Sequence, residues 1–171
     1  MDLEEIMNTE ENMLYLLSLK NDPESLKASI NQEPRKLETF RKDFKCSYFT
    51  HMICPLFITF NGERVGYIGF TDNHKEKYHI ISLIIDPRFR GNGFGAHGIQ
   101  LAIEYVRKNT SHYNRIVAYI KKWNIASIKS FTKAGFLKDS EDNELEKYVY
   151  YFGETIIFRR ISSKTLKKSN Q

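Results

Sequence analysis

Residues 80–96 read IISLIIDPRFRGNGFGA, and the fold is inferred outward from this stretch. The apolar run 80–85 is typical of a buried strand, and Asp86 and Pro87 end it, because proline cannot donate a hydrogen bond to a strand ladder. Three glycines within five residues then lead into a helix and let the backbone approach a bound group closely. Since the N–H groups of a helix N-terminus bind anions, the turn predicts a phosphate-binding loop.

The glycine-rich turn also has a simpler interpretation, because any tight turn before a capped helix needs the same residues. Two flanking arginines, Arg88 and Arg90, and the amphipathic helix that follows favour the phosphate site. A dinucleotide-binding Rossmann fold would place this turn after its first strand, at the start of a series of βαβ units. Three strands are predicted before residue 86, so the Rossmann interpretation is excluded.

Hydrophobic periodicity divides the rest of the chain into helices and strands. Asn61 and Gly62 join two strand-like runs, which is a strong hairpin signal. We expect helices at 10–20, 34–45, 93–109 and 124–134 with a short turn from Pro23, and strands at 56–60, 65–70, 78–85, 115–120, from Phe136, at 147–152 and at 155–161. The last two strands are expected to form a closing hairpin. This order predicts an α/β fold with one sheet flanked by helices, not a doubly wound sheet.

A second motif lies at 124–136, NIASIKSFTKAGF. Asn124 and Gly135 alone would be ordinary caps of one helix. Together with Arg90-x-x-Gly93-x-Gly95, however, the stretch resembles the two conserved segments of the GNAT superfamily of N-acetyltransferases, Arg/Gln-x-x-Gly-x-Gly/Ala and Asn-x-x-Ala/Ser-x-x-x-Tyr-x-x-x-Gly-Phe. The resemblance is strongest over residues 55–137. It implies the GNAT fold, a central, mostly antiparallel mixed sheet of about six to seven strands flanked by about four helices.

The resemblance also implies acetyl-CoA as cosubstrate and names the residues that would bind it. Backbone amides at Ile84 and Ile85 would hold the acetyl carbonyl, Asn124 would contact the pantetheine arm, and the helix that carries Phe131 would flank the CoA. The pyrophosphate loop would consist of Arg90, Gly91, Asn92, Gly93, Phe94 and Gly95. No metal is expected.

The catalytic acid departs from the family pattern. The frequent tyrosine that protonates the departing thiolate falls at Phe131, which has no hydroxyl to donate. Ser130, Ser127 or Tyr119 are candidates to replace it, as is water. A free thiol has a pKa of about 8.5, so a thiolate leaves readily enough for the acid to be dispensable.

The catalytic base is equally open. His79 is the first candidate, because imidazole titrates near neutral pH, and Glu76 and His51 are weaker ones. Strand alternation opposes His79, since it shares a face with Ile81 and Leu83 and only one face can look at the acetyl group. A strand histidine without a catalytic role is an equally good interpretation.

The acceptor is inferred from what is missing and from the amino-terminal part. A lysine-like amine with a pKa of about 10.4 is rarely neutral at pH 7 and needs a base, whereas a sugar amine is less basic. Residues 19–24 (LKNDPE), Ser29 and the helix over 33–44 resemble the opening of GNAT enzymes that acetylate nucleotide-linked amino sugars. That opening has Trp-Arg-Asn-Asp-Pro, and Leu19 and Lys20 replace its first two residues here.

Two other functions stay open. One is protein or peptide N-acetylation, and the other is a CoA-binding sensor or interaction module that has lost catalysis at Phe131. Tyr148, Tyr150 and Tyr151 either line a substrate pocket or pack as ordinary strand residues.

Composition sets the wider limits. The 171 residues carry a formal net charge of +5, and 41% of them are hydrophobic. We expect one domain over 1–163 and a disordered basic tail over 164–171. The basic residues lack the aromatic interleaving of RNA-binding modules, so no nucleic acid partner is expected. No apolar run reaches the roughly 20 residues that span a bilayer, so we expect no membrane partner. The first residues are acidic and cysteine occurs only twice, so we expect a cytoplasmic protein. We expect it to be a monomer or a homodimer.

Overall fold

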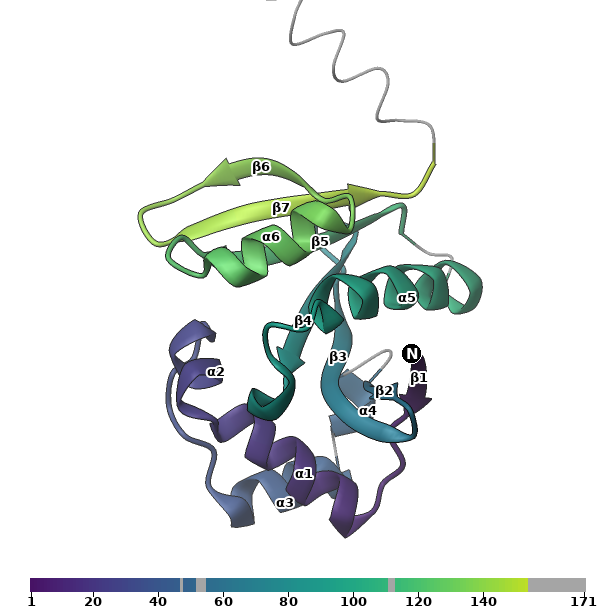
Figure 1. Ribbon diagram of the computed structural model, residues 1–171, viewed down its shortest axis with the longest axis vertical. Coiled ribbons are helices and arrows are strands. Elements are labelled where there is room, and N and C mark those ends of the chain that lie inside the picture. The colour runs from purple at the N-terminus through teal and green to yellow at the C-terminus, as the bar shows by residue number, and fades with distance from the viewer. Residues whose placement is uncertain (47, 52–54, 111–112, 154–171) are drawn as a thin grey trace, which may run out of the picture.

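Seven strands form one sheet in the described parts of this computed structural model, residues 1–46, 48–51, 55–110 and 113–153 (Figure 1). Their order in the sheet is β1-β2-β3-β4-β5-β7-β6. β4 and β5 are parallel, and the other neighbouring pairs are antiparallel. The predicted mostly antiparallel mixed sheet is therefore confirmed. The strands are β1 (Asp2–Glu5), β2 (Leu56–Phe60), β3 (Glu63–Asn73), β4 (Tyr78–Ile85), β5 (Arg115–Lys121), β6 (Leu137–Glu141) and β7 (Leu145–Tyr151).

Six α-helices and one 3-10 turn accompany the sheet in the described residues, where about four helices were expected. One of the two additional helices, α2, is the short turn expected from Pro23 and is 6 residues long. The other, α4, has only 4 residues, too few to show a helical period in the sequence. None of the helices in this part of the chain is long and apolar enough to cross a membrane. The helices are α1 (Glu10–Asn21), α2 (Pro23–Ala28), α3 (Leu37–Cys46), α4 (Tyr48–His51), η1 (Pro87–Phe89), α5 (Phe94–Asn109) and α6 (Ile125–Lys133).

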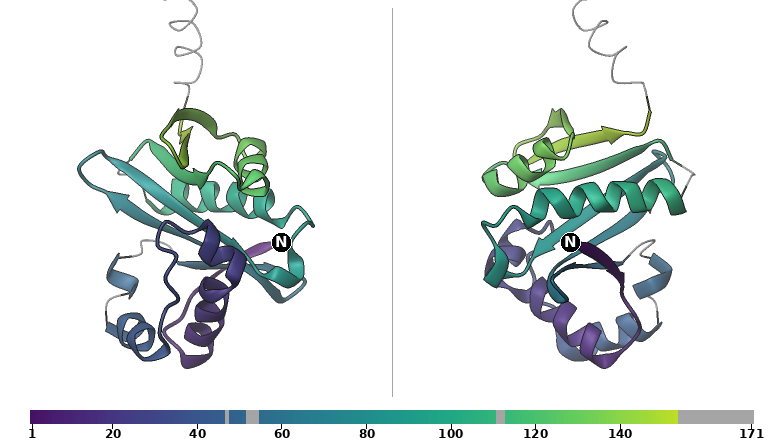
Figure 2. Two further views of the ribbon diagram at one scale, coloured as in Figure 1. Left: turned by 90° about the vertical axis from the view of Figure 1, so that its left-hand side faces the viewer. Right: turned by 45° about the vertical axis from the view of Figure 1, so that its right-hand side comes forward.

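The helices lie on both sides of the sheet and define its two faces (Figures 1 and 2). On the α5 face, α5 and α6 pack on buried side chains such as Ile68 and Phe70 of β3. On the α1 face, α1 and α3 pack on Phe57 of β2 and Tyr67 of β3. The alternation of β3 between the two faces fixes which of its side chains meet which helices.

β1 was not predicted. Its residues pair with residues 56–59 of β2, although its sequence, DLEE, has no alternating apolar pattern. A tertiary contact supports it, because Arg64 of β3 donates to Glu4 at 2.7 Å. A short charged strand held by its neighbour leaves no periodic signal in the sequence.

The carboxyl-terminal strands differ from the predicted closing hairpin. β7 pairs with β5 along one edge and with β6 along the other, so its hairpin partner is the strand before it. The expected strand at 155–161 and the expected tail at 164–171 lie outside the described residues, as does the end of the expected 1–163 domain.

Candidate active site

β4 and β5 lie side by side at one end and separate toward the other. They pair at only two positions, His79 with Ile116 and Ile80 with Val117. β4 nevertheless continues to Ile85, and β5 to Lys121. We call the opening between residues 81–85 and 118–121 the wedge. It exposes the inner edges of two central strands, which can hydrogen-bond a ligand in place of a strand partner.

The register of β3 and β4 shows which backbone groups face the wedge. The N–H of Asp86 donates to the carbonyl of Val65 on β3 at 3.0 Å. Because the direction of these groups alternates along an antiparallel strand, the N–H groups of Ile85 and Leu83 point away from β3, toward the wedge, and that of Ile84 points to β3. Of the two amides expected at the acetyl carbonyl, the geometry therefore favours Ile85 over Ile84.

The glycine loop follows directly on β4 and leads into α5. Gly91 and Gly93 have φ angles of +80° and +79°, which glycine adopts without strain. A Cβ atom at either position would meet no protein atom within 4 Å, so the space beside them is open to a ligand. Gly93 is the N-cap of α5 and provides no side-chain cap, which leaves the N–H groups of the first turn for an external acceptor.

Side chains hold the loop from within. Buried Asp86 accepts hydrogen bonds from the backbone and side chain of Arg88 at 2.9–3.1 Å and from the hydroxyl of Tyr15 on α1 at 3.1 Å. Burial alone would raise the pKa of Asp86, but these hydrogen bonds hold it below its usual value. The Asn92 side chain also turns back, with Nδ2 donating to the carbonyl of Phe89 at 3.2 Å. Both side chains serve the loop conformation, so a ligand would meet backbone groups.

Arg90 does not point into the open space of the loop. Its guanidinium forms an ion pair with Asp22, donates to Glu24 Oε2 at 2.6 Å and to Ser25 Oγ at 3.1 Å, and its Nε donates to the carbonyl of Ile85 at 3.2 Å. The side chain therefore ties the start of α2 to the end of β4. This pairing could not be predicted from local sequence, because 68 positions separate Arg90 from Asp22.

The second motif forms α6, which lies against the start of α5. Asn124 caps α6, with Oδ1 accepting from the N–H of Ser127 at 3.1 Å, so Nδ2 is the group left to serve a ligand. Gly95 in the first turn of α5 is closely packed, since a Cβ atom there would lie 3.0 Å from Ser130 Oγ. Ser130 itself donates to the carbonyl of Ala126 at 2.9 Å.

Phe131, the position of the family's tyrosine, is 3% exposed and packs edge-on against Phe136 with ring centroids 5.0 Å apart. Its ring belongs to the core on the α5 face. The side chain is therefore placed to support α6 rather than to touch a cofactor directly.

The sequence agrees with the geometry. The profile of the Acetyltransferase (GNAT) family matches residues 14–136, well over half of the chain. The chain belongs to the GNAT acetyltransferase family. The protein is therefore an acyltransferase that takes its acetyl group from acetyl-CoA, and the wedge, the glycine loop and α6 fit this cosubstrate. No group of three or more potential metal ligands occurs in the described residues.

Solved structures share the GNAT fold at low sequence identity. An aminoglycoside acetyltransferase in complex with coenzyme A has a TM-score of 0.73 and 15% identity, covering 93% of this chain and 97% of its own. A ribosomal-protein-alanine N-acetyltransferase from Brucella melitensis gives 0.70 and 16%, covering 89% and 100%. A putative acetyltransferase from Salmonella typhimurium with acetyl-CoA gives 0.72 and 17%, covering 90% and 95%. No curated protein matches the sequence significantly.

Among the candidate bases of this GNAT protein, His79 lies at the closed end of the wedge. It is 0% exposed, and Nδ1 lies 2.6 Å from Asp72 Oδ1 on β3. An acceptor amine cannot reach a fully buried imidazole, so the structure argues against His79 as the base. Glu76 lies in the exposed turn between β3 and β4, near the closed end too. His51 ends α4, and its side chain is outside the described part of the chain.

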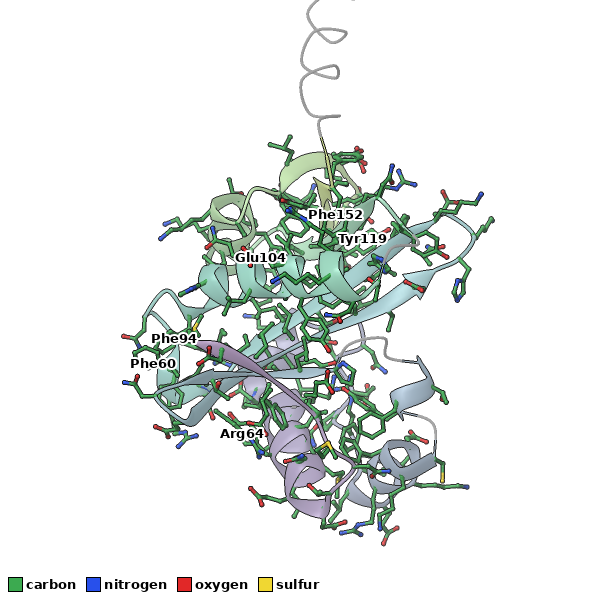
Figure 3. The ribbon with its side chains drawn as sticks, turned by 90° about the vertical axis from the view of Figure 1, so that its right-hand side faces the viewer. Phe60, Arg64, Phe94, Glu104, Tyr119 and Phe152 are labelled. Carbon is green, nitrogen blue, oxygen red and sulfur yellow. The ribbon has the colours of Figure 1, made fainter. Side chains whose placement is uncertain are left out.

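The α1 face of the wedge carries polar groups from β4 and β5, of which only Tyr119 had been named from the sequence. Ser82 is exposed in the middle of β4, where a central strand would normally be covered. By the β4–β5 register, Tyr119 of β5 lies across the wedge from it, with its hydroxyl 2.7 Å from that of Tyr78. Tyr119 is labelled in Figure 3. Burial, followed by the hydrogen bond with Tyr78, raises the pKa of Tyr119 to about 12, so the phenol keeps its proton at neutral pH.

Aromatic and cationic side chains flank the two ends of this site. At the start of α5, Phe94 lies beside Phe60 of β2, with ring centroids 5.0 Å apart (Figure 3). Beyond the end of β5, Lys27 of α2 lies over the ring of Trp123, with Nζ 4.9 Å from the centroid. The second contact joins the helices of the amino-terminal part to the strands beyond the wedge.

Proposed function

We propose that this GNAT acetyltransferase transfers the acetyl group directly to a primary amine, and that the acceptor is a nucleotide-linked amino sugar. The observation that carries the proposal is the wedge, which opens next to a helix N-terminus without a side-chain cap. A thioester in the wedge and a phosphate at the loop would both accept hydrogen bonds from backbone N–H groups that have no partner within the sheet or the helix.

Each part of this site has a task in the transfer. Bound acetyl-CoA supplies a thioester carbonyl. The N–H of Ile85, which faces the wedge, donates to the carbonyl oxygen and stabilises the negative charge that develops on it. The acceptor nitrogen forms the new C–N bond while the C–S bond breaks, and the proton lost by nitrogen passes to water. Binding both partners in one wedge supplies the orientation on which such transfers depend.

Tyr119 is our choice for the acid that protonates the leaving thiolate. Its hydroxyl lies on a strand that lines the wedge and stays protonated at neutral pH. The Ser130 hydroxyl already donates to the carbonyl of Ala126, and Phe131 has no proton to give. Ser130 is placed instead beside Gly95, where it shapes the start of α5.

The choice of acceptor is supported by the weak basicity it requires. His79 is buried, and the carboxylates near the loop, Asp22, Glu24 and Asp86, are engaged by arginines. An acceptor whose amine is already largely neutral suits such a site, as a sugar amine does. The turn between α1 and α2, which resembles that of enzymes acting on nucleotide-linked amino sugars, is held against β4 by Arg90.

Two alternatives are kept for the same test. Protein or peptide N-acetylation has a solved relative in fold, the ribosomal-protein-alanine N-acetyltransferase. A CoA-binding module without catalysis is suggested by Phe131. The cytoplasmic location and the monomeric or dimeric state stay predictions.

The deciding experiment measures release of free thiol from acetyl-CoA against nucleotide-linked amino sugars, free amino sugars, polyamines and peptides. We expect turnover on the nucleotide-linked amino sugars at the highest kcat/KM. Turnover on peptides alone would replace our choice of acceptor. Thermal stabilisation by CoA with no turnover on any amine would favour the sensor.

A further inference from the structure

A lysine on the α1 face is partly buried and forms no ion pair with a carboxylate of the described residues. Lys20, in the last turn of α1, places Nζ 4.7 Å above the ring of Tyr67. Tyr67 is completely buried, and its hydroxyl accepts a hydrogen bond from Tyr48 of α4 at 2.9 Å. Because Tyr67 pairs with Ile84 across β3 and β4, Lys20 lies above the part of β4 that borders the wedge.

A second cation is held beside the first. The backbone of Arg35 is fixed to the end of α1 by two reciprocal hydrogen bonds with the Asn21 side chain, both 2.8 Å long. The charge of Arg35 acts on Lys20 and on the phenols of Tyr48 and Tyr67. The Arg35 backbone is thus held next to the end of the helix that carries Lys20, and the Arg35 charge helps to lower the pKa of that lysine.

No carboxylate neutralises this pair within the described residues. Neither Lys20 nor the Arg35 guanidinium forms an ion pair there, and the nearby acids of α2, Asp22 and Glu24, are bound to Arg90. Burial, followed by repulsion from Arg35, lowers the pKa of Lys20 to about 8. Burying positive charge without a counter-charge lowers the stability of the folded protein, and a bound anionic ligand would restore part of that stability.

We propose that Lys20 and Arg35 bind an anionic group of the acceptor, a phosphate or a carboxylate. The proposal rests on the proposed acetyl transfer and deepens it, because a nucleotide-linked amino sugar carries phosphates that this pair of cations would hold. The anion would lie on the α1 face next to Ile84, so that the amine of the same molecule can reach the wedge. Polycationic acceptors such as aminoglycosides would be repelled by this pair.

A direct binding test separates this site from the catalytic proposal. The protein is saturated with CoA, which occupies the glycine loop, and is then titrated calorimetrically with inorganic pyrophosphate at low ionic strength. We expect binding to the wild type and a loss of affinity of about 10-fold or more in Lys20→Met and in Arg35→Met, because each loses a charge-assisted hydrogen bond to the anion. Lys20→Arg keeps the charge and should bind with near wild-type affinity.

The matched control is Lys42→Met, which removes an exposed lysine of α3. Its affinity for pyrophosphate should equal that of the wild type. Absence of binding to the CoA-loaded wild type, or equal losses in Lys20→Met and Lys42→Met, would overturn the anion site. Either outcome is independent of whether any amine is acetylated.

A kinetic test identifies the source of the charge. Glucosamine, glucosamine 6-phosphate and muramic acid offer a related amine without an anion, with a phosphate and with a carboxylate. We expect the better of the two anionic acceptors to have a lower KM than glucosamine, and Lys20→Met to raise the KM for that acceptor more than the KM for glucosamine. A charged acceptor with no advantage in the wild type, or equal KM increases for all three in Lys20→Met, contradicts the proposal.

Discussion

Replacing Lys20 by methionine should make the protein more stable at neutral pH. The side chain is partly buried over Tyr67, and its pKa falls from an ordinary 10.5 to about 8. A shift of about 2.5 units corresponds to about 3 kcal/mol, at about 1.4 kcal/mol per unit. This is the cost of keeping the lysine protonated in the folded protein below pH 8. Methionine has a similar length and no charge, and it loses a cation–π contact of about 0.5–1 kcal/mol.

The net expectation at pH 7 is a gain of about 2 kcal/mol in the free energy of unfolding. The gain should shrink as the pH rises from 8 to 10.5. Over that range the folded wild type has released the Lys20 proton while the unfolded chain still holds it, so wild-type stability rises with pH. The neighbouring phenols titrate later, since burial raises the pKa of Tyr48 to about 12 and that of Tyr67 well above its ordinary value.

Urea unfolding of both proteins at pH 7 and pH 10 measures this difference directly. Lys42→Met is the control, because loss of an exposed lysine should change stability by less than about 0.5 kcal/mol at either pH. A Lys20→Met protein that is no more stable than the wild type at pH 7, or whose advantage does not depend on pH, refutes the reasoning. It would mean that the charge of Lys20 is already balanced in the free protein.

Four further substitutions test the site. Gly93→Ala should strain the loop and put a methyl group where a ligand would lie, so calorimetry should show a loss of CoA affinity of about 10-fold or more. The control Gly153→Ala, at another positive-φ glycine with open space around it, should leave CoA affinity unchanged. Equal CoA affinities in the two variants would contradict the loop assignment. Phe131→Tyr should lower the free energy of unfolding by about 1–2 kcal/mol without raising kcat, because the new hydroxyl enters the core beside Phe136. A higher kcat would show instead that the edge of this ring reaches the CoA sulfur. His79→Asn should destabilise the protein by about 1–3 kcal/mol and leave the pH–rate profile unchanged. If the variant loses the pH dependence of the rate that reports the general base, His79 is the base after all. Tyr119→Phe should lower kcat about 10-fold or more with little change in CoA affinity, and an unchanged kcat would remove it as the acid.

Much of the fold was predictable because it depends on local signals. The strands at Leu56–Phe60 and Tyr78–Ile85 were predicted with their observed bounds, since apolar runs bounded by turn residues can form little else. The glycine loop and its helix were also predictable from the sequence, because only glycine adopts the backbone conformation of Gly91 and Gly93 without strain. β1 was not, because a strand of charged residues forms only when a neighbour pairs with it.

The candidate site divides in the same way. The two family motifs could be recognised from the sequence, because glycines at fixed spacing and a capped helix leave a local pattern; the cofactor-binding roles of their residues stay predictions. The roles of Arg90 and His79 could not be named, since the first depends on Asp22 across the fold and the second on burial at the closed end of the wedge. A contact between distant segments leaves no trace in local periodicity.

The sequence by itself indicated the cosubstrate of this protein, because its two motifs resemble the segments with which the GNAT family binds acetyl-CoA and because glycines at a helix N-terminus suit a phosphate. Only the tertiary structure decided what surrounds that loop. The separation of β4 and β5 creates the wedge, and the packing of α1 on the sheet places Lys20 over Tyr67. Charge and burial become specific only when distant segments meet, and for this reason the acceptor depends on the fold.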